Sequence, residues 1–370
     1  MACLRIGVNA LYMIPGGVGG TEIYLRNLLQ ALAEVDHENQ YFVFTNRETG
    51  ADLVPAAVNF IHSPQPINAA FRPGRLIWEQ TGLPLAARRL KLDRLFNAGF
   101  TAPIFGPCPS VTVFHDLQHK RHPEHFRWFE LPFWDLFLYG AAKRSAMLVA
   151  VSEATKADLI RFYKLPASKI RVAPHGVERE FFEIENNPDP GDPYLLCVST
   201  LHPHKNLERL IRVFAEFRRS RPEFRLVIAG LRGIHAELLE SISDEHVRLT
   251  GWIPREDLYA LFRGASAFIY PSTFEGFGMP VLEAMAAGIP LASSSIEPLR
   301  SIVHSSAVLF EPDDDAGMLE AMKRITSDVS LRGTGRQRAA EFTWQAAARQ
   351  TLAAIIGAVP SPLLPPGMPG

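Results

Sequence analysis

The stretch AFIYPSTFEGFGMPVLEAMAAG occupies residues 267–288 and has three parts. Its opening AFIYPS, at 267–272, is apolar and rich in aromatic and branched side chains, which is typical of a buried strand. A loop with two glycines follows. Pro280 then lies in the first turn of a helix predicted to begin near Met279. The stretch therefore predicts strand, glycine loop and helix in sequence, the unit from which parallel α/β domains are built.

The same alternation of short apolar runs and longer amphipathic segments extends over the whole chain. Strands are predicted at 5–11, 41–45, 58–62, 94–98, 111–115 and 147–152, and then at 194–200, 224–230, 247–251, 267–272, 290–294 and 307–310. Helices are predicted at 21–34, 153–163, 206–219 and about 343–356. This order indicates an α/β fold with two parallel, Rossmann-like sheets.

The two series of strands are separated by EIENNPDPGDP, where proline, glycine and acids replace periodic apolar residues. We therefore predict a first domain over 1–183, a linker over 184–193 and a second domain over 194–342. Residues 343–370 are expected to form a helix that packs back across the hinge, followed by a proline-rich tail. Ligands of open α/β sheets bind at the carboxyl ends of the strands, so we expect the site in a cleft between the two sheets.

Composition limits the classes of function. The 370 residues are 47% hydrophobic and 21% charged with a net charge of −1, which describes a globular protein without overall attraction for nucleic acid. Three scattered cysteines, Cys3, Cys108 and Cys197, fit a reducing compartment better than a disulfide framework. We find no signal-peptide pattern and no apolar run long enough to span a bilayer, and expect a cytoplasmic protein.

The segment after the 267–272 strand carries the chemistry of the second domain. Backbone amides of a glycine loop and helix start suit a phosphate. Glu275 and Glu283 flank those amides, and a carboxylate can accept hydrogen bonds from two hydroxyls of a sugar or ribose. The alternative is a loop charge at Glu275 and a favourable helix-start charge at Glu283.

Lys205 follows a strand and directly precedes a helix in VSTLHPHKNLERLIRVF. A cation at a helix N-terminus is electrostatically unfavourable, which disfavours a purely solvated lysine and indicates an anionic ligand. We predict that Lys205 neutralises a departing phosphate.

With these motifs the whole chain resembles the retaining glycosyltransferases of family 4, which have the GT-B fold. The E-x7-E motif of that family is matched by Glu275 and Glu283. The resemblance implies that Glu275 contacts hydroxyls of the donor sugar and Glu283 the ribose of the nucleotide. It also implies donor contacts from the intervening residues Gly276, Phe277, Gly278, Met279 and Pro280. A nucleoside diphosphate sugar as co-substrate, retention of configuration and independence from metal ions are further implications.

One departure from the family concerns an arginine that many members carry before the lysine. Here those places hold His204 and Ser199 or Thr200. His202 or His204 would be the substitute phosphate ligand.

In the first domain, the resemblance places His115 of VTVFHDLQHKRHP beside the reacting sugar, although a histidine at a strand end is often structural. Asp116 is predicted to cap the following turn. The loop PGGVGG at 15–20 lacks the order of a dinucleotide fingerprint. By resemblance, Gly17, Gly19 and Gly20 would lie near the diphosphate and acceptor. The alternative is a flexible turn.

Two patterns resemble metal sites, and neither is predicted to be one. His119, His122 and His125 recur at a spacing of three, but no carboxylate or cysteine completes a convincing set. The Asp-x-Asp in PDDDAG (312–317) opens a helix, where acids are favourable as caps.

The WEQ segment at 78–80, together with the His-Asp and Lys-Asn pairs, most resembles bacterial mannosyltransferases of O-antigen and exopolysaccharide assembly. GDP-mannose is therefore the expected donor and a saccharide or lipid-linked saccharide the acceptor. The alternatives are a UDP-sugar donor, a non-catalytic nucleotide- or sugar-binding protein, and an NAD-dependent oxidoreductase, which the glycine order disfavours.

Two segments of the first domain are candidates for contact with a membrane or a lipid diphosphate. Region 71–94 has six basic residues against two acids, and 126–139 is rich in aromatic residues. A solvated basic face and an ordinary core helix are the equally weighted alternative. Membrane contact would place the protein at the inner face of the membrane.

Overall fold

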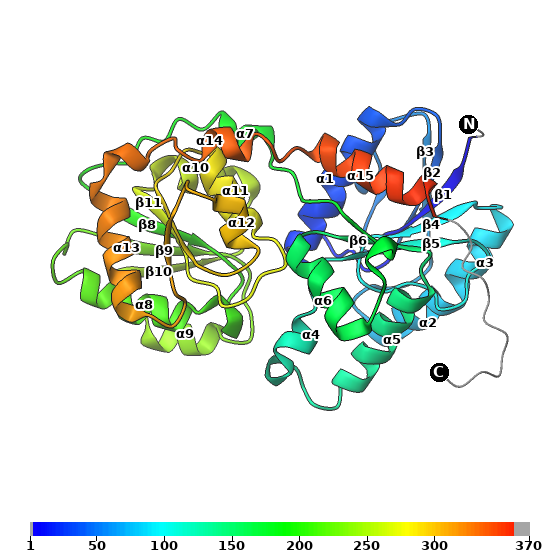
Figure 1. Cartoon of the computed structure of the whole chain (residues 1–370), viewed down its shortest axis with the longest axis horizontal. Coiled ribbons are helices and arrows are strands. Elements are labelled where there is room, and N and C mark those ends of the chain that lie inside the picture. Colours follow the sequence, from blue (N-terminus) through cyan, green and yellow to red (C-terminus); the bar gives the residue numbers. More distant parts are fainter. Residues whose placement is uncertain (1–2, 359–370) are drawn as a thin grey trace. The chain divides into compact units, whose positions relative to one another are not determined.

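The computed structural model of the protein describes residues 3–358. The chain forms two compact units (Figure 1). Unit 1 contains the described residues up to Pro174 and those from Trp344 onward. Unit 2 is the continuous stretch His175–Thr343.

Unit 1 is built on a seven-stranded sheet in the order β3-β2-β1-β4-β5-β6-β7, with all strands parallel. The strands are β1 (Arg5–Asn9), β2 (Gln40–Thr45), β3 (Phe60–Pro64), β4 (Arg94–Asn97), β5 (Ser110–Phe114), β6 (Met147–Ala150) and β7 (Ile170–Val172). The helices are α1 (Gly20–Val35), α2 (Arg72–Gln80), α3 (Gly82–Arg89), α4 (Gln118–Arg121), α5 (Leu131–Arg144), α6 (Glu153–Tyr163) and α15 (Trp344–Ile356), with short 3-10 turns η1 (Ala51–Leu53), η2 (Pro123–His125) and η3 (Ala167–Lys169).

Unit 2 has a six-stranded parallel sheet in the order β10-β9-β8-β11-β12-β13. The strands are β8 (Tyr194–Val198), β9 (Arg225–Ala229), β10 (Val247–Gly251), β11 (Ala267–Tyr270), β12 (Leu291–Ser294) and β13 (Val308–Phe310). The helices are α7 (Arg179–Phe182), α8 (Leu207–Phe217), α9 (Ala236–Ile242), α10 (Arg255–Gly264), α11 (Met279–Ala286), α12 (Leu299–Val303), α13 (Asp315–Ser327) and α14 (Arg336–Ala339), with 3-10 turns η4 (Pro203–Lys205) and η5 (Val329–Leu331).

Every predicted strand is present, and the two parallel sheets confirm the predicted α/β class. The prediction missed β7, which has three residues at the edge of its sheet and exposes Arg171 between Ile170 and Val172. A strand this short shows too little alternation to be distinguished from a loop.

The predicted domain boundary needs correction, because the chain passes into unit 2 at His175 and not in the linker expected at 184–193. Phe181 is fully buried, with its ring 5.1 Å from that of Tyr259 and 5.0 Å from that of Phe262, both in α10. The Pro- and acid-rich segment is therefore a surface loop of unit 2. The composition of this segment predicted a loop correctly. It could not show that Phe181, which precedes the loop, packs against α10 of unit 2.

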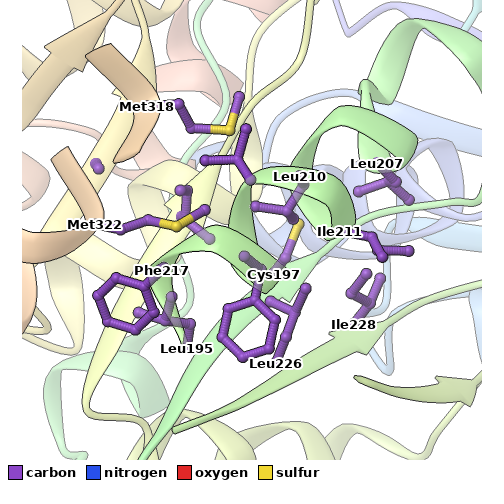
Figure 2. Packing of buried hydrophobic residues seen from close by; sticks show 14 of the residues in the cluster. Leu195, Cys197, Leu207, Leu210, Ile211, Phe217, Leu226, Ile228, Met318 and Met322 are labelled. Atoms are coloured by element: carbon purple, nitrogen blue, oxygen red, sulfur yellow. The ribbon is translucent and has the colours of Figure 1, made fainter. Parts of the chain in front are cut away.

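A large buried cluster of unit 2 lies between the sheet and helices α8, α9 and α13. Figure 2 shows Cys197 of β8, Leu210 of α8 and Met318 of α13 in one buried cluster. α8 contributes a continuous apolar face, including Phe214 and Phe217, because its apolar residues recur at helical spacing. Burial raises the pKa of the Cys197 thiol to about 12, which makes this cysteine an inert packing group.

Helix α15 returns to unit 1 and packs beside α1 (Figure 1). Its buried face includes Trp344, Ala348 and Ile355, spaced at helical periodicity. A helix was predicted from about residue 343, and α15 begins at Trp344 and belongs to unit 1.

In both sheets the strand order reverses direction at one place. In unit 2 the chain proceeds outward from β8 through β9 to β10, and then from β11 through β12 to β13 on the other side. The corresponding neighbours in unit 1 are β1 and β4. Loops that leave neighbouring strands in opposite directions open a crevice at the carboxyl edge, and ligands of open α/β sheets bind there.

Candidate functional site

The strongest candidate site of unit 2 lies where β8 and β11 end. The Lys205 Nζ, in the loop after β8, donates to Glu275 Oε1, in the loop after β11, at 2.6 Å. It also contacts the hydroxyl of Tyr270, the last residue of β11, at 3.2 Å. The Lys205 and Glu275 side chains are only 14% and 9% exposed, so this ion pair is shielded from solvent far more than an ordinary surface pair.

Hydrogen bonds between the loop after β8 and the loop after β11 hold Lys205 and Glu275 close to each other. Asn206 has a left-handed backbone with φ 57°, and its Nδ2 donates to the carbonyls of Pro271 at 3.1 Å and Pro312 at 2.8 Å. The Thr273 N–H donates to the His204 carbonyl at 2.8 Å. Asn206 is the N-cap residue of α8 and directly follows Lys205, so the residue that joins the loops also fixes the turn that carries Lys205.

The sequence indicated Lys205 and Glu275 for separate tasks, phosphate and sugar, and the structure brings them together. The unfavourable position of a cation before α8 is balanced by the Glu275 carboxylate in this ligand-free state. A group that binds here meets a cation and a hydrogen-bond acceptor within one small site. A sugar bound through a phosphate offers the matching anion and hydroxyl groups.

The loop between the two glutamates approaches its surroundings closely. Gly278 has φ 109°, and a Cβ at this position would lie 2.3 Å from Leu299 Cδ2, so only glycine fits. The Phe277 side chain is 5% exposed and packs against the rings of His175 and Phe342. Phe277 therefore anchors the loop in the core, and what it presents to a ligand is its backbone.

Glu283, on α11, lies in a second ionic cluster. Its Oε1 accepts from Arg255 Nη2 at 2.8 Å, and Arg255 also binds Glu178, which accepts from the Tyr259 hydroxyl at 2.7 Å. Burial raises the pKa of the Glu283 carboxyl, while the Arg255 guanidinium opposes this shift. Glu283, which was predicted to bind the ribose, thus has one of its two carboxylate oxygens bound to Arg255.

Arg255 was not among the predicted site residues, yet the sequence carried a signal for it. It is the first residue of α10, which is the same unfavourable position for a cation that marked Lys205. Applied to every helix start, that argument would have found Arg255, although not its partners Glu178 and Glu283.

His202 and His204 lie together just before Lys205, with ring centroids 5.9 Å apart and an angle of 19° between the rings. His204 also contacts the Phe274 ring at 6.4 Å, next to Glu275. His204, at one of the places where the family carries arginine, therefore lies next to the loop that carries Glu275.

In unit 1, His115 follows β5 and is 7% exposed. Its ring packs edge-on against Tyr24 at 4.7 Å and Phe100 at 5.2 Å, and Nε2 lies 3.0 Å from the Ala98 carbonyl. Because a carbonyl only accepts, Nε2 carries the proton of the neutral ring. Burial lowers the pKa of His115 to about 4, so the side chain is uncharged at neutral pH.

The glycine loop at 15–20 follows β1, at the place where the sheet of unit 1 reverses direction. Gly19 has φ 58° and precedes Gly20, the first residue of α1. The Gly16 N–H donates to Glu22 Oε2 at 2.8 Å, and a Cβ on Gly17 would lie 3.0 Å from Ile14 Cγ2. The hydrogen bond to Glu22 ties the Gly16 backbone to α1.

The capping role predicted for Asp116 and for the PDDDAG segment is confirmed. Asp116 Oδ1 accepts from the Gln118 N–H at 2.9 Å. Asp314, in the Asp-x-Asp segment, is the N-cap of α13 and accepts from the Gly317 N–H at 3.0 Å. The Asp-x-Asp segment therefore starts a helix.

The histidines with a spacing of three do not come together as a set, and the reason given against a metal needs correction. His119 is separate, with Nε2 2.9 Å from the Tyr163 hydroxyl. His122 and His125 lie with a carboxylate, Glu124, and the potential ligand atoms of these three are within 4.8 Å of one another. His122 Nδ1 is 2.9 Å from Glu124 Oε1. Two imidazoles and a carboxylate are donor groups that zinc accepts, and independence from metal ions stays a prediction.

The WEQ segment holds α2 in place. Glu79 is 1% exposed and accepts from Asn9 of β1 at 3.2 Å and from Thr101 at 2.9 Å. Trp78 Nε1 donates to Gln65 at 3.2 Å. These side chains bond to neighbouring parts of unit 1.

Two parallel-sheet units, each with a glycine loop where the strand order reverses, define a two-domain α/β protein with a candidate ligand site at the carboxyl edge of a sheet. A family model described as Glycosyltransferase Family 4 matches residues 18–181, and one described as Glycosyl transferases group 1 matches residues 178–342. The chain belongs to the family 4 glycosyltransferases, and its fold is GT-B.

Relatives agree with this assignment. The chain is 26% identical to O-antigen chain mannosyltransferase B of Escherichia coli, over 66% of this chain and 69% of that protein. It is 26% identical to the MMP alpha-(1->4)-mannosyltransferase of Mycolicibacterium hassiacum, over 90% of this chain and 94% of the relative. It spans only about a third (32%) of the serotype-specific mannosyltransferase WbdA of Escherichia coli.

Solved structures share the fold at low identity. Sucrose-phosphate synthase from Thermosynechococcus elongatus superposes with a TM-score of 0.74 at 19% identity, covering 94% of this chain and 97% of that one. HepE from Anabaena, in complex with UDP-glucose, superposes with a TM-score of 0.70 at 18% identity, covering 95% and 99%. Over residues 3–358, no helix has the length and apolar character needed to cross a membrane.

Proposed function

We propose that this protein transfers mannose from GDP-mannose to a saccharide or lipid-linked saccharide in the assembly of a surface polysaccharide, with retention of configuration and without a metal ion. The observation that carries the proposal is the shielded Lys205–Glu275 pair at the carboxyl ends of β8 and β11. The mannosyltransferase names of the two relatives above support the choice of sugar.

In the proposed reaction, the donor separates the pair. Lys205 turns to the diphosphate and Glu275 accepts hydrogen bonds from hydroxyls of the sugar. The bond from the anomeric carbon to the diphosphate breaks while the acceptor oxygen bonds to the same face of that carbon. The acceptor's proton passes to the departing phosphate oxygen. Lys205 stabilises the charge that develops on the leaving group.

The test measures nucleotide release from a panel of GDP- and UDP-sugars, with a disaccharide or lipid-linked saccharide as acceptor. Lys205→Ala and Glu275→Ala should each lower turnover at least about a hundredfold, as expected when one electrostatic contact to a transition state is lost. Lys323 and Glu320 form an exposed ion pair in the same unit, and Lys323→Ala and Glu320→Ala are the matched controls. Full activity of either site variant would overturn the site assignment.

The panel also separates the alternatives. GDP release from GDP-mannose alone supports the proposal, whereas release of UDP from a UDP-sugar would replace the donor. Tight nucleotide binding without turnover of any sugar would favour a binding protein. A hydride transfer to NAD would favour an oxidoreductase.

The acceptor is proposed to be attached to a lipid at the inner face of the membrane. Regions 71–94 and 126–139, which the sequence indicated for membrane or lipid contact, support this part of the proposal because they expose large apolar side chains, among them Ile77 of α2 and Phe133 of α5.

A further inference from the structure

Helices α2 and α5 line one apolar groove of about 710 Å³ in unit 1. Most of its wall comes from six large apolar residues: Leu76, Ile77, Phe129, Phe133, Trp134 and Phe137. Ile77 is 64% exposed and Phe133 66% exposed, which is unusual for side chains of this size. A groove of this volume matches the size of sites that take one small ligand.

The polar residues of the wall turn their hydrogen-bonding groups away from it. Gln80 Nε2 donates to the Ala102 carbonyl at 3.0 Å, and Gln80 Oε1 accepts from the Ile104 N–H at 2.8 Å. Thr81 Oγ1 donates to the Ile77 carbonyl at 2.8 Å. The interior therefore offers a ligand almost no hydrogen bonds, so the part of a ligand that enters it must be apolar.

Charged groups reach the groove at two residues. The Arg72 guanidinium lies over the Trp134 ring, 5.3 Å from its centroid, and within residues 3–358 it forms no ion pair. Glu130 also lines the groove. An anionic head group attached to an apolar chain would therefore be held at the Arg72 side, where stacking on Trp134 keeps the cation in place.

Helix α5 buries one face in the core of unit 1, where Leu138 and Ala142 lie in a hydrophobic cluster, and exposes large apolar side chains on another. Phe133, Leu136 and Tyr139 are 66%, 61% and 46% exposed, and Trp128, just before the helix, is 81% exposed. Exposed apolar side chains gathered on one element mark an interaction surface. Because this surface is hollowed into a groove, one narrow apolar chain fills it better than a flat partner surface would.

We infer that this groove binds the hydrocarbon chain of one lipid whose head is a phosphate or diphosphate, with Arg72 on the head group. The inference rests on the proposed function in that such a lipid would carry the saccharide acceptor. It adds a binding site for the lipid part of the acceptor within unit 1.

The test is direct binding, without turnover, of farnesyl diphosphate to the full chain in the presence of saturating GDP, which occupies the donor site. Titration calorimetry measures the affinity, and inorganic diphosphate and farnesol are run in parallel. The groove variant is Ile77→Gln with Phe133→Gln, both at exposed positions where folding is not at risk. Its matched control is Leu85→Gln with Val58→Gln, which are 55% and 102% exposed in the same unit and outside the groove.

We expect farnesyl diphosphate to bind, the groove variant to weaken binding at least about tenfold, and the control to leave it unchanged. Arg72→Gln should weaken the binding of farnesyl diphosphate more than the binding of farnesol. Equal affinity of groove variant and control would overturn the inference, as would binding of inorganic diphosphate as tight as that of farnesyl diphosphate. Binding only to anionic phospholipid vesicles would indicate a general membrane surface in place of a lipid-binding groove. Self-association of the chain through the groove would indicate that a second copy of the chain occupies it.

Loss of lipid binding leaves nucleotide release to a soluble acceptor intact, so failure here and failure of the proposed function are distinguishable.

Discussion

Lys205 and Arg255 form the same kind of ion pair at two places in unit 2. Each is a cation at or just before the start of a helix, and each is bound to a glutamate of the E-x7-E motif. The motif glutamates thereby compensate two unfavourable helix-start charges in the ligand-free protein. The pairs differ in their surroundings, since Arg255 also holds Glu178.

Arg255→Met should destabilise the protein by about 3 kcal/mol. The change leaves Glu178 and Glu283 close together without their shared cation, and breaking a buried ion pair on one side costs about that much. Urea unfolding at pH 7.5 measures the effect. Arg263→Met, at an exposed position of the same helix, is the control and should change stability little. Equal stability of the two variants would show that the cluster adds nothing to folding.

The burial of His115 predicts a dependence of stability on pH. Its pKa is about 4 in the folded protein and 6.5 ordinarily, so the unfolded chain binds the proton first as the pH falls. Stability is unaffected above about pH 6.5 and is lost progressively between about 6.5 and 4, by about 2 kcal/mol at pH 5. Urea unfolding at pH 7.5 and 5.0 should show a smaller loss in His115→Gln than in the wild type.

The exposed histidine variant His37→Gln is the control for this measurement and should lose as much stability as the wild type. A His115→Gln protein with the full wild-type loss would contradict the buried, neutral state of His115.

At the scale of elements, α15 shows how the end of the chain contributes to the first unit. It packs beside α1 through a face of small residues, with Ala347, Ala348 and Ala354 buried together with Trp344 and Ile355. Small side chains allow the two helices to approach closely, which leaves no room for a larger or charged group.

Ala348→Glu should therefore destabilise unit 1 by more than about 3 kcal/mol, because an unpaired carboxylate would be forced into a packed interface. Ala353→Glu places the same charge on the exposed face of the same helix and should change stability by less than about 0.5 kcal/mol. Thermal unfolding of both variants tests this. Similar melting temperatures would mean that α15 does not pack on α1 as described.

At the scale of the whole molecule, the two units differ in continuity. Unit 2 is one stretch, His175–Thr343, whereas unit 1 needs both ends of the chain. Each has its own hydrophobic core, with the α8 and α13 cluster in unit 2 and separate clusters in unit 1. A continuous stretch with its own core can fold alone.

A fragment of residues 175–343 should therefore fold cooperatively, whereas a fragment ending at Pro174 should not, because it lacks α15. Circular dichroism and urea unfolding of both fragments measure this, with the full chain as reference. A fragment ending at Pro174 that unfolds as cooperatively as unit 1 of the full chain would contradict the role assigned to α15.

Much of the fold could be predicted because it is written in local patterns. The strands at 5–9 and 267–270, the helix Glu153–Tyr163 and the caps Asp116 and Asp314 each depend on residues a few positions apart. The strand–loop–helix unit at 267–288 could likewise be recognised from its own residues. These include Gly278, whose backbone conformation requires glycine.

Other features were decided only by the tertiary structure, because they join residues that are distant in the sequence. Glu275 meets Lys205 and Glu283 meets Arg255 only because parallel strands bring their carboxyl ends to one edge. The true boundary at His175 depends on Phe181 packing against α10. The groove exists because α2 and α5, which the sequence suggested separately, line the same space. Local pattern determines which elements form, and the packing of those elements determines which side chains meet.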